Sequence, residues 1–173
     1  MADSNTTKRA LADSLKELME RKPFSKISVG DICDSCGMNR KSFYYHFCDK
    51  YDLVNWIFYT EFVHTLNYVP EDNGWVHLNA VCRYFYENKK FYSKALQIEG
   101  QNSFKDYFSD ILESILLEYF HQYYANDKDS SFAAEFYTDA IICSLIRWLT
   151  SKNCISPEEF TENIHRCVRM IRK

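Results

Sequence analysis

The chain has 173 residues, 46% of them hydrophobic, which is enough to bury a core in one or two domains and excludes disorder of the whole chain. It contains only four glycines and three prolines and lacks β-branched runs, so we expect an all-α protein with short loops. The net charge of −3 argues against a uniformly basic nucleic-acid coat.

The first predicted helix covers residues 7–21, where apolar residues recur at helical spacing. Asn5 or Thr6 can cap its start. Pro23 ends it, because proline lacks an amide donor and disfavours helical geometry in the residue before it.

Two further short helices follow. Ser28 and Asp31 have the spacing of a capping box and predict a helix that reaches Cys36. Gly37 is placed to end that helix, and Asn39 is a good cap for the next one. Two short helices joined by a glycine-containing turn are the outline of a helix-turn-helix.

The rest of the chain predicts a connecting helix and a helical bundle. The capping pattern at Asp49 opens a helix to about Leu66, and the polar segment 70–74 is a loop. About nine helices are therefore expected, the last five near 75–88, 89–98, 103–124, 131–151 and 156–171.

The third helix has two distinct faces. At about 100° per residue, Phe43 and Phe47 share an inward face, while Lys41 and Tyr45 point most nearly the opposite way. Residues 1–50 hold nine Lys and Arg against seven Asp and Glu, whereas the remainder holds twelve against seventeen. If DNA is bound, the first part binds it.

Basic side chains lie at helix starts, where the helix dipole disfavours cations by some tenths of a kcal/mol. Arg40 and Lys41 open the third helix, and Lys50 opens the fourth. Binding of DNA phosphates would compensate for this unfavourable placement. The alternative is that these side chains form an ordinary charged turn exposed to solvent. Neighbouring rings at Tyr44 and His46 suit phosphate and groove contacts, and packing at an interface is their alternative interpretation.

These segments resemble the DNA-binding domain of the TetR/AcrR regulators. The likeness covers about residues 8–56 and is carried by the segments 28–47 (SVGDICDSCGMNRKSFYYHF) and 49–53 (DKYDL). It implies an N-terminal helix-turn-helix domain, residues 1–50, and a dimerisation and sensor domain, residues 51–173. It also implies a non-enzymatic regulator that binds duplex DNA as a homodimer.

The resemblance implies roles for particular side chains. Base or groove contacts fall on Arg40, Lys41 and Tyr45, and Asn39 and Ser42 belong to the same surface. Phosphate contacts fall on Tyr44, His46 and Lys50, and Ser28 and Val29 approach the DNA backbone. The family usually has a small residue where Lys41 stands and a serine where Asn39 stands, so the operator sequence does not transfer.

Within the family, three segments resemble the branch that contains activators of the dihydroxyacetone kinase operon: 22–29, 51–57 and 149–159. In that branch a partner protein relays the signal and regulation can be activation, whereas repression is commoner across the family. The controlling signal here is therefore an unknown small-molecule effector or a coactivator protein.

Other functions compete with DNA binding. Cys33, Cys36, His46 and Cys48 are zinc-ligand types at close spacing, but thiols also fill cores, and we expect no metal or cofactor. A redox sensor would need an exposed thiol of low pKa. Enzyme motifs are missing, so the alternative is a helical interaction or redox- or metal-sensing protein that uses the helix-turn-helix as a scaffold.

Two C-terminal helices carry apolar stripes that suit a symmetric four-helix interface, because operator half-sites require two reading heads. The predicted interface residues are Phe132, Phe136, Ala140, Cys143, Ser144, Trp148, Phe160, Ile164, Cys167, Val168 and Ile171.

Aromatic residues between the two regions are mostly core, but some can line an effector pocket. The pocket candidates are Trp56, Tyr59, Phe62, Phe85, Tyr86, Tyr107 and Phe108. The odd cysteine number, the polar N-terminus and the lack of a long apolar stretch predict a soluble, cytoplasmic protein with no membrane partner.

Overall fold

The computed structural model describes residues 2–65, 75–124 and 126–169, and this part of the chain is helical with no strand. The prediction of an all-α fold with about nine helices is confirmed. The helices are α1 (Ala2–Arg21), α2 (Val29–Ser35), α3 (Arg40–His46), α4 (Lys50–Glu61), α5 (Trp75–Glu87), α6 (Lys89–Ala95), α7 (Phe104–His121), α8 (Asp127–Thr150) and α9 (Pro157–Arg169). Two 3-10 turns, η1 (Phe24–Lys26) and η2 (Val63–Thr65), join them.

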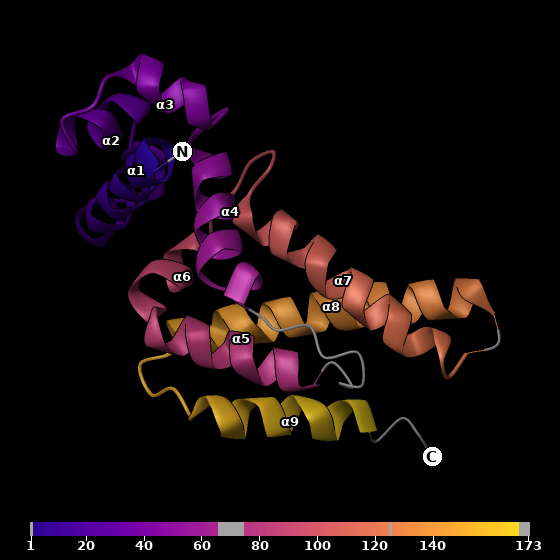
Figure 1. Ribbon diagram of the computed structural model, residues 1–173. Coiled ribbons are helices and arrows are strands. Elements are labelled where there is room, and N and C mark those ends of the chain that lie inside the picture. Colours follow the sequence, from indigo (N-terminus) through magenta and orange to yellow (C-terminus); the bar gives the residue numbers. More distant parts are fainter. Residues whose placement is uncertain (1, 66–74, 125, 170–173) are drawn as a thin grey trace.

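The helices form a small head and a larger body (Figure 1). We call α1 to α3 the head and α5 to α9 the body, and α4 leads from one to the other. In the body, α7 and α8 pack side by side as a long hairpin, and α9 packs along α5.

Polar caps begin most of these helices, as the sequence predicted for α2, α3 and α4. In each case a side-chain oxygen accepts an amide N–H of the first turn, which would otherwise have no partner. The capping residues are Ser28 for α2, Asn39 for α3, Asp49 for α4, Ser103 for α7 and Asn126 for α8.

Some helix ends differ from the prediction. The first helix begins at Ala2, so Asn5 and Thr6 lie inside it, because no glycine or proline interrupts residues 2–10. The fourth ends at Glu61 and not near Leu66, because the backbone at Phe62 leaves regular helical geometry with a φ of −119° and the 3-10 turn η2 follows. The predicted loop at 70–74 lies outside the described residues.

One hydrophobic core runs from the head into the body, and it includes Phe58 of α4. Its ring is buried, with ring centroids of five other aromatics 5.3 to 6.2 Å away: Phe62, Phe85, Tyr92, Phe104 and Phe108. α4 packs against α1 of the head and against α7 of the body.

No helix among the described residues is long and apolar enough to cross a membrane. Within the same ranges, no group of three His, Cys, Asp or Glu side chains is placed to hold a metal ion. The seven cysteines are all free thiols.

Candidate nucleic-acid interface

The start of α2 is held by a capping box. The Asp31 amide donates to Ser28 Oγ at 3.1 Å, and the Ser28 amide donates to Asp31 Oδ2 at 2.7 Å. Lys22 Nζ lies 3.2 Å from the same carboxylate oxygen. The bonds from Ser28 and the nearby Lys22 lower the pKa of Asp31 to about 2, so the cap stays charged at neutral pH.

The turn between α2 and α3 sets the angle between these two helices. Gly37 has a φ of 68°, a conformation that side chains with a Cβ rarely adopt. The Met38 amide then donates to Cys33 O at 2.9 Å, which closes the turn. Asn39 Oδ1 accepts the Ser42 amide at 2.8 Å, so the oxygen of this predicted DNA-binding residue serves as a helix cap.

The two faces of α3 are as the sequence predicted. Phe43 and Phe47 are buried inside the head, whereas Tyr45 is 82% exposed and Tyr44 is 59% exposed. Lys41 is exposed beside them. The outward face of α3 therefore offers a cation and two phenol groups to a partner outside the chain.

The remaining predicted contact residues are exposed or half-buried. Arg40 and Ser28 are exposed, and Val29, Ser42 and His46 are half-buried. The Tyr45 and His46 rings meet edge to face with centroids 4.9 Å apart. α2 and α3, which carry these residues, pack against each other in the head (Figure 1).

Lys50 was predicted to hold a phosphate, and in the structure its ammonium group has partners within the chain. Its Nζ donates to Phe24 O at 2.8 Å and to Ile27 O at 2.7 Å, and it lies 4.3 Å from the centroid of the Phe24 ring. Burial lowers the pKa of Lys50. The ammonium group therefore braces the turn between α1 and α2, a role that depends on residues more than twenty positions away.

We expect Lys50→Met to destabilise the protein by about 1–3 kcal/mol, because two charge-assisted hydrogen bonds are lost and their carbonyls stay half-buried. Urea unfolding measures this loss. The salt dependence of DNA binding should stay unchanged; a slope reduced by about one with unaltered stability would restore the phosphate role.

The exposed face of α8 carries four of the eleven predicted dimer contacts. Phe132 is 70% exposed and Phe136 is 57% exposed, and their rings stack with centroids 6.4 Å apart. Ala140 and Cys143 continue this exposed face along the helix. Apolar rings this exposed are typical of a surface that a partner covers. On α9, Cys167 is exposed and Ile164 is half-buried; Ser144 of α8 is also half-buried.

Three predicted interface residues belong instead to the core of the chain itself. Trp148 and Phe160 are buried and stack with centroids 4.3 Å apart, and Val168 is buried as well. The Trp148 indole N–H donates to Ile155 O at 2.9 Å. The stack of Trp148 on Phe160 joins α9 to α8, and all three buried side chains have little surface left for a partner. Ile171 lies outside the described residues.

An apolar cavity of about 310 Å³ lies between α4, α5 and α7. Of the seven predicted pocket residues, only Phe62 and Phe108 line it. The lining residues that sequence reasoning missed include Phe58, Leu78, Val81 and Leu112, with His77 as a polar neighbour. Helical spacing places each of them on an apolar face, but it does not say which faces meet around an empty space.

The other pocket candidates have different surroundings. Phe85 is fully buried in the aromatic core, and Trp56 packs on Phe47 with centroids 5.6 Å apart. Tyr86 stacks on the Trp148 ring at 5.7 Å, Tyr107 is half-buried outside the cavity lining, and Tyr59 is 48% exposed.

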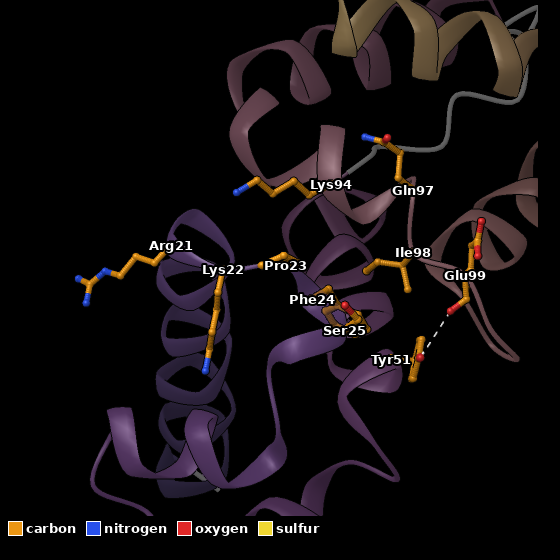
Figure 2. Close-up of a pocket in the computed structure, with 10 residues that line it drawn as sticks. All are labelled: Arg21, Lys22, Pro23, Phe24, Ser25, Tyr51, Lys94, Gln97, Ile98 and Glu99. Carbon is orange, nitrogen blue, oxygen red and sulfur yellow. Dashed lines mark hydrogen bonds between the residues drawn. The ribbon is translucent and has the colours of Figure 1, made fainter.

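A second hollow, of about 650 Å³, lies at the joint between head and body (Figure 2). It is bridged by polar contacts, since Lys94 Nζ of α6 donates to Met19 O and, at 3.3 Å, to Glu20 O at the end of α1. The Tyr51 hydroxyl donates to Glu99 O at 3.5 Å. Arg21 points away from the other lining residues in Figure 2. The bonds from Lys94 therefore attach α6 to α1 of the head across this hollow.

Comparison with known proteins agrees with this arrangement. Residues 6–57 match the family described as bacterial regulatory proteins, tetR family, and residues 76–170 match the transcriptional regulator C-terminal region. The chain is 30% identical over 154 residues to the HTH-type dhaKLM operon transcriptional activator DhaS of Lactococcus lactis subsp. lactis (strain IL1403), covering 85% of this chain and 81% of that protein.

Solved structures give the same result. The dihydroxyacetone kinase operon activator DhaS superimposes with a TM-score of 0.67 at 26% identity, over 95% of this chain and 94% of that one. A TetR transcriptional regulator from Streptococcus agalactiae 2603V has a TM-score of 0.75 at 20% identity, over 96% of both chains, and shows the shared fold. With both parts of the chain matched, the protein belongs to the TetR family of bacterial transcriptional regulators.

Proposed function

We propose that this regulator binds a two-fold-symmetric operator as a homodimer and that an effector or partner protein controls its affinity for DNA. Residues 1–50 would form the DNA-binding domain, and residues 51–173 the dimerisation and sensing domain. The observation that carries the proposal is the outward face of α3, where Tyr45 is 82% exposed beside the exposed Lys41. Side chains this exposed are accessible to a partner, and they are suited to a groove and its phosphates.

Dimerisation is supported by the exposed rings of Phe132 and Phe136 on α8. A helix-turn-helix protein reads half-sites about one helical turn of DNA apart, which requires two heads held at a fixed distance. A symmetric contact between the two copies of α8 would hold the two heads at a fixed distance and would cover the rings of Phe132 and Phe136.

Control by a ligand is supported by the apolar cavity and by a chain of contacts that leads from it to the head. Phe62 lines the cavity and stacks on the Tyr84 ring, with centroids 5.1 Å apart. The Tyr84 hydroxyl donates to Glu61 Oε2 at 2.7 Å, and Glu61 Oε1 lies 2.5 Å from Lys16 Nζ of α1. Burial raises the pKa of Tyr84, which keeps this hydroxyl protonated and able to donate.

A ligand that displaced Phe62 would therefore disturb the attachment of α1 to α4 and shift the position of the head. The cavity walls are mainly apolar, so the effector we expect is a small, largely uncharged molecule. The two DhaS relatives are both named activators, and this likeness favours activation of a nearby operon.

The test is selection of bound duplexes from a random pool at near-physiological salt, followed by affinity measurements at several salt concentrations. A recovered two-fold-symmetric site with a steep salt dependence supports the proposal. Binding that is indifferent to salt, or no enrichment with and without candidate effectors, would favour the alternative of a helical interaction or sensing protein. The buried Cys33 thiol, whose pKa is raised by burial, already speaks against redox sensing at that position.

Two groups of substitutions on α3 should behave differently. Lys41→Ala or Tyr45→Ala should relax base preference by about 1–3 kcal/mol at the contacted position. Tyr44→Phe or His46→Ala should instead weaken binding to all sequences alike. Competition titrations with single-base operator variants measure both, and equal effects from the two groups would refute this division of roles.

A further inference from the structure

Gly30 of α2 has no side chain, and the guanidinium group of Arg40 fills the space that one would take. A Cβ built on Gly30 would lie 2.6 Å from Arg40 Nη2 and 3.3 Å from both Cζ and Nε. Arg40 is the first residue of α3, and its side chain therefore lies against the first turn of α2.

The backbone does not require glycine at this position. The glycines with positive φ are Gly37 and Gly100, whereas Gly30 lies within the regular helix α2. Glycine inside a helix is less favourable than alanine. What the missing side chain allows is the close approach of Arg40.

Arg40 also lacks an internal partner. Across the part of the chain that the structure describes, no hydrogen bond or ion pair to its guanidinium is found, and Asp31, the acid in the first turn of α2, is already engaged by Ser28 and Lys22. The exposed Arg40 side chain therefore keeps its five N–H donors for a group outside the chain.

In a helix-turn-helix the first helix crosses the DNA backbone, while the outward side chains of the second enter the groove. A guanidinium folded back onto α2 is thus placed at the backbone. Its planar fork of donors matches phosphate oxygens. Base contacts then fall to Lys41 and Tyr45, which point away from the head.

We propose that Arg40 binds a DNA phosphate and not a base edge, and that Gly30 is the positioning residue that lets it do so. The inference rests on the proposed DNA-binding function and deepens it by assigning the contact. It replaces the base or groove contact that the sequence predicted for Arg40.

The experiment compares Gly30→Ala, Arg40→Ala, the double variant and Ser35→Ala. Ser35→Ala is the control, because it changes a residue at the other end of α2 and adds no bulk near Arg40. Binding of the selected duplex is followed by fluorescence anisotropy at several salt concentrations. Both single variants should bind roughly tenfold more weakly. Each should lower the salt slope by about one without changing base preference, and the double variant should be no weaker than Arg40→Ala.

The thermal midpoint distinguishes displaced Arg40 from misfolding. Because alanine favours helix, Gly30→Ala should melt at the same or a higher temperature than the unaltered chain while binding DNA more weakly. Gly30→Ala with unaltered affinity and salt slope would overturn the inference alone, as would an Arg40→Ala variant that loses preference at one base pair. An unaltered chain that binds no duplex would overturn the proposed function and this inference together.

Discussion

Replacing Phe132 and Phe136 together by aspartate should convert a dimer into a folded monomer that binds its operator at least about a hundredfold more weakly. The two rings are the largest exposed apolar groups on α8, and charged groups in their place would oppose contact between two copies of the helix. Without the dimer, the second head is no longer held near its half-site, and the gain from joint binding is lost. Sedimentation velocity and fluorescence anisotropy on the same samples measure the two effects.

The matched control is Tyr59→Asp, which places the same charge on an exposed aromatic position of α4. It should leave both the sedimentation coefficient and the operator affinity close to those of the unaltered chain. A double variant that still sediments as a dimer would show that the subunits meet through another face, and α8 would then lose its proposed role.

Phe58→Ala should cost about 3–5 kcal/mol of folding free energy, because it removes a buried ring that packs among five other aromatic rings and leaves a cavity. A domain of this kind has a total stability of only about 5–15 kcal/mol. The thermal midpoint should fall by about 6–20 °C. Urea unfolding and calorimetry provide the measurement.

Tyr59→Ala is the control for this loss, since the neighbouring residue on α4 is half exposed and should cost less than about 0.5 kcal/mol. Benzene should restore part of the stability of Phe58→Ala, because a dry apolar cavity binds small apolar molecules. A loss below about 1 kcal/mol would mean that the aromatic cluster is loosely packed and that Phe58 belongs to an adaptable pocket.

Local features of this protein were open to prediction because their partners lie close in the chain. The Ser28 capping box, the Asn39 cap and the Gly37 turn involve residues within about four positions, so residue type and spacing are sufficient to identify them. The inward and outward faces of α3 follow from helical periodicity in the same way. The helix-turn-helix and its exposed face therefore came from the sequence alone.

Tertiary structure decided every feature that depends on a distant partner. The sequence does not reveal that the ammonium group of Lys50 donates to Phe24 O and Ile27 O, because these carbonyls lie more than twenty positions away. The stripes of α8 and α9 look alike in sequence, yet Trp148 and Phe160 stack inside the chain while Phe132 and Phe136 of α8 stay exposed.

The cavity follows the same rule. Periodicity marks Tyr59 and Phe62 equally as candidates, but only Phe62 turns into the space between α4, α5 and α7. Hydrophobic pattern determines that a helix has a buried face, because that face must leave water. Which helix covers that face, and whether a space remains between them, depends on packing among segments far apart in the sequence, and the folded chain alone determines it.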